Sequence, residues 1–129
     1  MIKMDEYQKG LAAVKESIEI LKEKFGDKIY SVILYGSFAR REQNFDDIDI
    51  FIITNHSLGP VYKVTNMFTQ EVFLKPSDKY GMLFSPLVYD KNHFNQLKRF
   101  YPLLGDIKRE GICLYGKKVL TKKTIESLS

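Results

Sequence analysis

The sequence predicts an α+β fold in which helices pack against a small mixed β-sheet. Three observations support this class: an amphipathic N-terminal segment, two apolar runs of strand length behind it, and later helical segments that alternate with short β-rich runs. The 129 residues fit a single domain, 1–129, with one core, and 44% hydrophobic with 28% charged residues is typical of a soluble globular protein.

The first helix is predicted over residues 5–25, before a glycine that favours a helix end. Its apolar side chains recur at helical spacing, namely at Leu11, Val14, Ile18 and Leu21. Residues 29–35 are rich in β-formers and predict the first strand. Residues 48–53 predict a second strand, and because this run is almost continuously apolar, both of its faces should be covered.

The connection between these two strands has about a dozen residues, too many for a tight hairpin and enough for a ligand-binding loop. Residues 38–42 can form one helical turn within it. Asn44 and Asp46 then favour a turn directly before the second strand.

The following segment predicts one helix and one strand. Residues 61–72 fit a helix, which the sequence Pro76-Ser77-Asp78 should end. Residues 82–89 predict a third strand, and Pro86 within it favours a position at an edge of the sheet.

The C-terminal part predicts two short helices and a last strand. Asp90 is a suitable N-cap for the first helix. Pro102 can open the second helix and Gly111 can cap it. Residues 112–115 predict the last strand, and residues 117–129 predict a basic tail that is solvated and partly frayed.

Composition limits the possible partners and the compartment. The net charge of +4 and pI near 9.1 suit a chain that handles polyphosphates or an acidic partner, but the lysines are too dispersed for a dedicated nucleic-acid binder. The single Cys113 predicts a buried thiol and a cytoplasmic protein. No apolar stretch approaches the ~20 residues that cross a membrane, so no membrane association is expected.

A Gly-Ser pair and an Asp-x-Asp pair carry the functional signal. Asp47 and Asp49 should point to one face, where two carboxylates repel each other unless a cation lies between them. Magnesium accepts such ligands together with substrate phosphates. Gly36 lets the backbone approach a phosphate, Ser37 adds a hydroxyl, and Arg40 can contact a phosphate oxygen. The residues therefore predict a site for a magnesium-bound nucleoside triphosphate.

Taken singly, these features have simpler interpretations. A Gly-Ser pair after a strand is usually a turn, and Asp-x-Asp is common on loop rims; only the coupled spacing favours a site. Arg41 is expected to pair with Glu42 or to face solvent. His56 and His93 are predicted as loop or cap residues and not as zinc ligands, because neither has ligand spacing to another His or Cys.

The segment 36–49 resembles the signature of the DNA polymerase β-like nucleotidyltransferase superfamily, and in particular its minimal nucleotidyltransferase (MNT) family. The motif of that family reads Gly-Ser-x-Ala-Arg-Gly and later Ser-Asp-Ile-Asp. Here Arg41 replaces the usual second glycine and Asp46 replaces the usual serine. The late segment 107–116 also resembles the end of that domain.

The resemblance implies transfer of a nucleoside monophosphate, expected to be AMP from ATP, to an acceptor that is expected to be a protein. It implies that Asp47 and Asp49 are catalytic Mg²⁺ ligands and that Gly36 and Ser37 contact the triphosphate. Many members work beside a helical HEPN-type protein, some as toxin and antitoxin, so the chain is expected to be the antitoxin of such an MNT/HEPN pair. The oligomeric state is left open, with a homodimer as one option.

One departure from the family pattern favours an alternative. Active members often carry a third carboxylate on a later strand, where this chain has Ser85. Asp90 could replace it only with a shifted register, and Glu71 is expected on a helix. The alternative is therefore a degenerate, non-catalytic module that binds a nucleotide or a partner.

Overall fold

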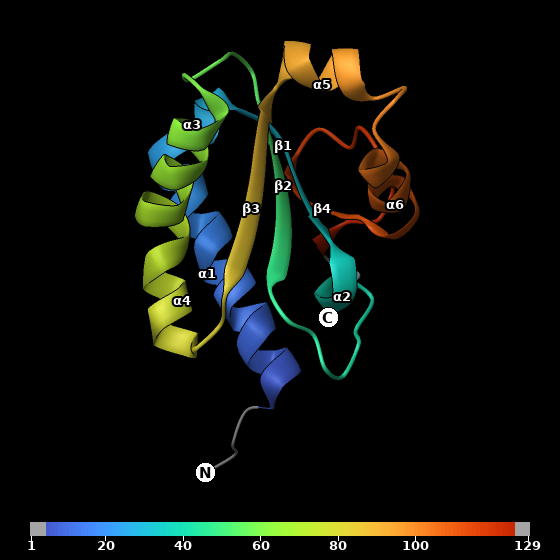
Figure 1. Ribbon diagram of the computed structural model, residues 1–129. Coiled ribbons are helices and arrows are strands. Elements are labelled where there is room, and N and C mark those ends of the chain that lie inside the picture. The colour runs from blue at the N-terminus through green and yellow to red at the C-terminus, as the bar shows by residue number, and fades with distance from the viewer. Residues whose placement is uncertain (1–4, 126–129) are drawn as a thin grey trace.

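The structure is a computed structural model that describes residues 5–125. A four-stranded sheet with the order β3-β2-β1-β4 forms its centre (Figure 1). The strands are β1 (Ile29–Tyr35), β2 (Ile48–Thr54), β3 (Phe84–Asp90) and β4 (Ile112–Gly116). Strand β1 is antiparallel to β2 and to β4, whereas β2 and β3 are parallel. The predicted α+β class with a small mixed sheet is confirmed.

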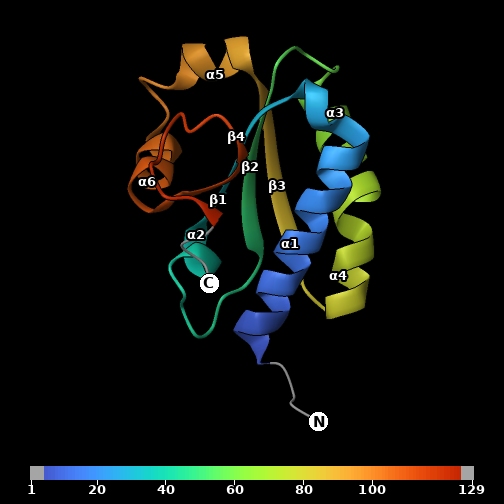
Figure 2. The same cartoon turned by 180° about the vertical axis from the view of Figure 1, so that it is seen from behind.

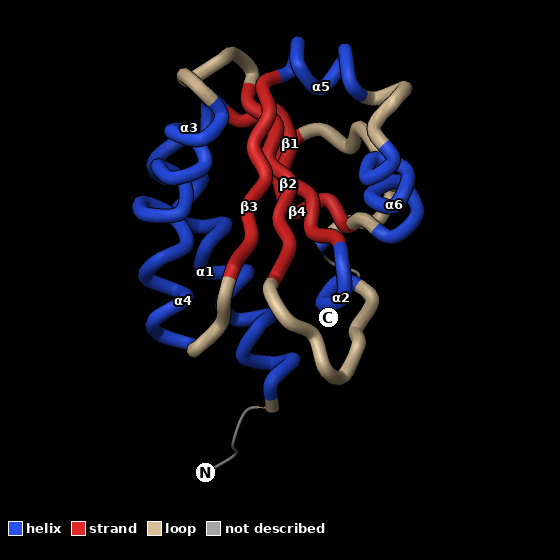
Figure 3. The backbone as a smooth tube through the Cα atoms, in the orientation of Figure 1, coloured by secondary structure: helices blue, strands red, loops and turns tan. Residues whose placement is uncertain are grey.

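Helices cover both faces of the sheet. Figures 1 and 2 show one layer on one side, formed by α1 (Glu6–Phe25), α3 (Val61–Phe68) and α4 (Leu74–Tyr80). The tube in Figure 3 shows α5 (Lys91–Leu97) and α6 (Pro102–Glu110) on the other side. The sheet therefore separates two apolar cores.

Strand β2 is covered on both faces, as its apolar sequence predicts. Ile48, Ile50 and Ile52 belong to the core beneath α1 and α3, whereas Phe51 and Ile53 belong to the core beneath α5 and α6. These five side chains are 0–1% exposed. Because side chains alternate along a strand, the remaining polar position near its start, residue 49, lies on the α6 side.

Helix α1 begins with a capping box and packs closely on the connection between β1 and β2. Asp5 accepts a hydrogen bond from the Gln8 N–H at 2.7 Å, and the Gln8 side chain accepts one from the Asp5 N–H at 3.1 Å. Farther along α1, a Cβ on Gly10 would lie 2.9 Å from Cζ of the fully buried Phe38. Glycine therefore allows α1 to contact the Phe38 ring directly.

The predicted helix end at Pro76 is wrong. The helical path continues from α3 through a widened turn, Thr69–Phe73, into α4, which ends at Tyr80. The widened turn is the physical reason, since wide helical turns absorb the missing N–H and the ring bulk of a nearby proline. Pro76 itself is buried.

Most other element bounds differ from the prediction by one or two residues, as helix and strand ends commonly do. The short turn starts earlier than expected, because α2 spans Gly36–Ala39. The expected helix cap is confirmed: Asp90 accepts a hydrogen bond from the His93 N–H at 2.9 Å. Gly111 follows α6 as expected, and Cys113 is buried in β4.

Residues 117–125 of the segment predicted as a solvated, partly frayed tail contact the sheet, and the lysines among them are exposed. The Ser31 hydroxyl donates to the Lys117 carbonyl at 2.6 Å, and the Cys113 N–H donates to the Lys123 carbonyl at 2.8 Å. Thr121 is buried and donates to the Gly111 carbonyl. Residues 126–129 of that expected tail lie outside the described residues.

Helices long and apolar enough to span a membrane are absent from residues 5–125.

The packing of α1 on Phe38 leads to a stability prediction. Gly10→Ala should lower the free energy of unfolding by about 1–3 kcal/mol, because the added methyl overpacks a ring that is fully buried against Tyr7 and Phe45. Gly105→Ala in α6 is the matched control: the nearest atom to its new Cβ, Nη1 of Arg109, lies at 3.6 Å. That variant should be more stable by about 0.5–1 kcal/mol, from helix propensity alone. Urea unfolding of both variants checks this, and equal gains would contradict the packing account.

Candidate active site

The site lies where the end of β1 meets the start of β2. Tyr35 and Asp49 are direct partners in the antiparallel ladder, so the chain leaves β1 for α2 beside the Asp49 side chain. Gly36 has φ +82°, and a Cβ on it would collide with the Asp49 carboxylate and lie 3.0 Å from its Cγ. Glycine is required here for its backbone angle and for the space that it leaves.

Asp47 and Asp49 lie together at the foot of β2, and both are half-buried. Burial raises the pKa of the Asp49 carboxyl above its ordinary value, and the negative charge of Asp47 raises it further. Asp47 directly precedes the strand, whose first N–H, from Ile48, donates to the Leu83 carbonyl at 2.8 Å. The two predicted acids are thus close enough to repel each other, as alternation along a strand predicts.

Ser37 and Arg40 lie on the short helix that follows Gly36. Ser37 is half-buried in α2, and Arg40 is the residue at which this helix ends. The Arg40 guanidinium pairs with Glu110 through Nη1 at 2.8 Å and with Glu42 through Nε. The structure therefore places all five predicted site residues along one connection, from the end of β1 to the start of β2.

Glu110 enters this region from α6 and is absent from the prediction. Its carboxylate accepts hydrogen bonds from the Gly36 N–H at 3.1 Å and from Arg40 at 2.8 Å. The charge of Glu110 also contributes to the raised pKa of Asp49. The only sequence signal was the resemblance of segment 107–116 to the end of the MNT domain, which did not indicate a contact with Gly36.

The strand that often carries a third acid has none beside the pair. Ser85 is the direct partner of Asp49 in the parallel β2–β3 ladder, and it is exposed. The register is not shifted: Asp90 pairs with Thr54 at the other end, about 17 Å along the strand from Ser85. Glu71 lies in the widened turn after α3, in the helical layer on the opposite face. Neither alternative acid takes the place of Ser85.

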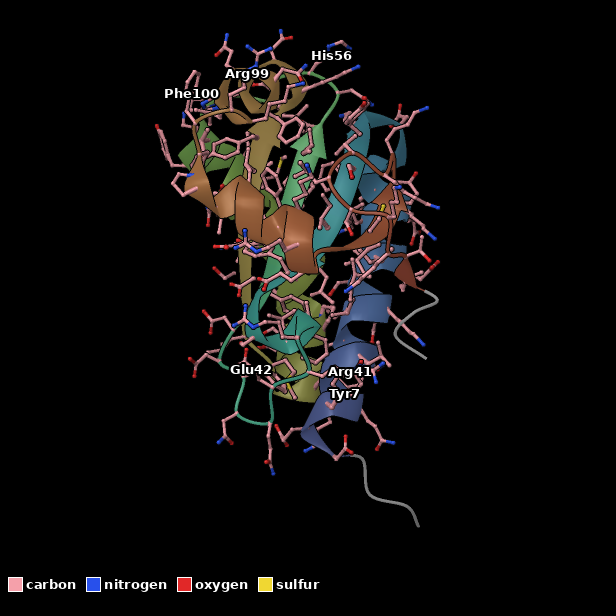
Figure 4. The ribbon with its side chains drawn as sticks, turned by 90° about the vertical axis from the view of Figure 1, so that its right-hand side faces the viewer. Tyr7, Arg41, Glu42, His56, Arg99 and Phe100 are labelled. Atoms are coloured by element: carbon pink, nitrogen blue, oxygen red, sulfur yellow. The ribbon has the colours of Figure 1, made fainter. Side chains whose placement is uncertain are left out.

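Arg41 takes the place of the second glycine of the family motif, and its backbone angle shows why glycine is usual there. Its φ is +59°, the left-handed region in which glycine is favoured, so the usual glycine of the motif suits this backbone. In this chain the Arg41 guanidinium lies 5.1 Å from the centre of the Tyr7 ring, an attraction that offsets part of the backbone cost. Figure 4 shows the two side chains together where α1 begins.

The two histidines lie at the other end of the sheet. Figure 4 shows His56 there, far from Arg41, and His56 and His93 line the same open hollow beside Asp90. Asp90 is engaged in capping α5. Within residues 5–125 no group of three or more His, Cys, Asp or Glu side chains is arranged to hold a metal ion.

The acidic pair nevertheless fits a magnesium ion that arrives with its substrate. Magnesium usually takes one or two protein carboxylates and fills its other positions with phosphate and water oxygens. Asp47 and Asp49 supply hard oxygen ligands, and their mutual repulsion is the electrostatic condition that a cation relieves. A complete protein cage is not needed for this mode of binding.

Comparison with known proteins gives the family. The model of the nucleotidyltransferase domain family matches residues 14–99. The chain is 26% identical over 115 residues to the "Putative protein adenylyltransferase MJ1305" of Methanocaldococcus jannaschii, covering 88% of this chain and 76% of that protein. It is 30% identical over 104 residues to the "Putative protein adenylyltransferase MJ0604" of the same organism, covering 80% of this chain and 95% of that protein.

Solved structures share the fold. A toxin–antitoxin crystal structure with AMP-PNP superimposes with a TM-score of 0.54 and 19% sequence identity, over 81% of this chain and 73% of that chain. The family match spans the Gly-Ser turn, the acidic pair and the whole of β3. The chain therefore belongs to the nucleotidyltransferase domain family and is a nucleotidyltransferase.

Proposed function

We propose that this protein transfers AMP from Mg-ATP to a hydroxyl group of a protein acceptor. The observation that carries this proposal is the half-buried acidic pair, Asp47 and Asp49, with the side-chain-free Gly36 pressed against it. Both archaeal relatives carry the name "Putative protein adenylyltransferase", and this name supports AMP as the group and a protein as the acceptor.

Each residue has a proposed role in that reaction. Asp47 and Asp49 hold the metal, and Mg²⁺, when bound, neutralises charge on the triphosphate. Gly36 leaves room for the Asp49 carboxylate next to the turn, and Ser37 offers its N–H and hydroxyl to phosphate oxygens. Arg40, 47% exposed, can exchange its exposed partner Glu42 for a phosphate.

The chemistry would be an in-line substitution at the α-phosphorus. The acceptor hydroxyl forms a new P–O bond, the bond to the β-phosphate oxygen breaks, and pyrophosphate leaves. Because Ser85 supplies no carboxylate beside Asp49, the proton of the hydroxyl passes to water in this scheme. The protein would contribute positioning and charge rather than a dedicated base.

A helical HEPN-type protein is the proposed partner and acceptor, with this chain as the antitoxin of the pair in the cytoplasm. The fold likeness to a toxin–antitoxin structure that contains AMP-PNP supports a nucleotide-binding antitoxin. The mild positive charge of this chain, +4, suits an acidic partner surface or a polyphosphate.

A second candidate function is a nucleotide-dependent binding module without transfer. The pairing of Ser85 with Asp49 favours it, because this pairing places a neutral residue where a general base would act. The two functions share the nucleotide site and differ only in whether the acceptor is labelled.

The proposal predicts magnesium-dependent ATP binding and transfer that depend on the acidic pair. Wild-type protein should bind Mg-ATP in calorimetry, and Asp47→Ala with Asp49→Ala should abolish binding. With ATP labelled at the α-phosphate, wild type should label an all-helical protein encoded by the neighbouring gene. The double variant should label it at least about 100-fold more slowly.

Asp46→Asn is the matched control, because Asp46 is an exposed carboxylate of the same loop. It should bind and transfer like wild type. Binding without label, across several nucleotides, would favour the binding module. Equal ATP binding by wild type and by the double variant would defeat both functions.

The raised pKa of Asp49 predicts a pH-dependent stability change. A carboxyl whose pKa is raised by folding stabilises the protein below its ordinary pKa of about 4, and that contribution is lost as the pH rises through the folded-state pKa. Asp49→Asn should therefore raise the melting temperature above that of wild type at pH 7, and the difference should shrink toward pH 4. Thermal unfolding at several pH values, with Asp46→Asn as the charge control, checks this; a stability loss in Asp49→Asn at pH 7 would contradict it.

A further inference from the structure

The side chain of Glu110 joins parts of the chain that are far apart in sequence. One carboxylate oxygen accepts from the Gly36 N–H at 3.1 Å, across 74 positions, and the other accepts from Arg40 at 2.8 Å, across 70 positions. The side chain is 20% exposed, whereas Arg40 is 47% exposed. Glu110 also lies outside the residues that match the family model, 14–99.

The base of Glu110 is held firmly by the sheet. It is the last residue of α6, and the next residue, Gly111, packs so closely on β1 that a Cβ there would lie 2.8 Å from Cγ2 of Ile33. Ile107, one turn earlier, is fully buried. The carboxylate is therefore presented from a fixed point and can define the position of whatever it binds.

The Gly36 N–H needs such an acceptor. Gly36 is buried, and a buried N–H without a partner costs about 1–3 kcal/mol. The bond from Glu110 satisfies this donor and directs the start of α2 toward Asp49, where the missing Cβ allows contact. The second bond holds the guanidinium of Arg40 at the end of the same short helix.

Glu110 has opposite electrostatic effects on its two charged neighbours, Asp49 and Arg40. Glu110 adds to the unfavourable charge around Asp49, and Arg40 only partly offsets it. The same carboxylate pairs favourably with Arg40, and its two directed hydrogen bonds fix where its charge lies.

We propose that Glu110 is a positioning residue of the nucleotide site: its carboxylate fixes the Gly36–Ser37 turn against Asp49 and orients Arg40 for the triphosphate. This inference rests on the proposed function for the part that concerns nucleotide. It gives Gly36 a specific role, because its N–H is bound to Glu110 and its missing side chain faces Asp49.

The alternative hypothesis, in which Glu110 only occupies a phosphate position, predicts the opposite change in ATP affinity. If the carboxylate only occupied the place of a phosphate, its removal would free Arg40 and the Gly36 N–H, and ATP would bind more tightly. A positioning residue requires the reverse, because its removal loosens the turn. The sign of the change in affinity therefore separates the two.

The experiment compares Glu110→Ala, Glu110→Gln and Asp106→Asn in the full chain. Asp106 is the matched control, since it is an exposed carboxylate on the same helix that pairs with Arg109, three residues away. One readout is hydrogen exchange of the Gly36 amide by NMR, and the other is the Kd of Mg-ATP by calorimetry.

Glu110→Ala should speed exchange at Gly36 and weaken Mg-ATP binding, each by about 10-fold, the equivalent of one buried hydrogen bond. Glu110→Gln retains an acceptor for Gly36, so it should preserve the amide protection and lose only about 3-fold in affinity through Arg40. Asp106→Asn should match wild type in both readouts.

Unchanged or tighter nucleotide binding by folded Glu110→Ala would overturn the proposal. Should that variant not fold, loss of Gly36 protection in Glu110→Gln would overturn it equally. If wild type binds no nucleotide, the proposed function fails, yet the exchange readout still decides on Glu110: equal protection of Gly36 in wild type and in Glu110→Ala would show that the carboxylate does not position the turn.

Discussion

The close contact between Gly36 and the Asp49 carboxylate is the constraint on which the rest of the site depends. The antiparallel register pairs Tyr35 with Asp49, so the chain must leave β1 directly beside that acid. It can do so only with a left-handed backbone and without a side chain. The pairing of β1 with β2 therefore brings Gly36 and the half-buried carboxylate of Asp49 together. A compact turn next to two acids is the arrangement that the proposed metal-bound polyphosphate would use.

The charges around this contact suit the cation and the polyanion of the proposed function, because without a ligand they disfavour an ionised Asp49. Asp47 and Glu110 both disfavour ionised Asp49, and Arg40 is the counter-charge that favours it. Such unfavourable clusters are typical of functional sites, where a ligand supplies the missing charge. The buried Gly36 N–H adds a geometric requirement, which Glu110 meets from α6. The site is thus assembled from the β1–β2 connection, which carries the Gly-Ser and Asp-x-Asp motif, and from the end of α6.

Features set by local sequence could be predicted, whereas contacts between residues far apart in the sequence could not. Strand β1 occupies the predicted residues, because local β-propensity and burial agree there, and alternation predicted that Asp47 and Asp49 lie together. Pro76 misled the helix prediction, since a widened turn before it could not be read from local sequence. Glu110 was missed for a similar reason: its partners lie about 70 positions away, and no spacing rule connects them. The packing of residues 117–125 against the sheet likewise depends on tertiary contacts.

The most direct test of this account uses two glycines with left-handed backbone angles. Gly36 has φ +82° with Asp49 against it, whereas Gly81 has φ +67° and nothing within 4 Å of the place where a Cβ would lie. Alanine strains the backbone at both positions but collides with the acid only at Gly36. Titration of Mg-ATP into each variant, with folding verified by circular dichroism, should show wild-type affinity for Gly81→Ala and a loss of at least about 10-fold for Gly36→Ala. Wild-type affinity in folded Gly36→Ala would contradict the account.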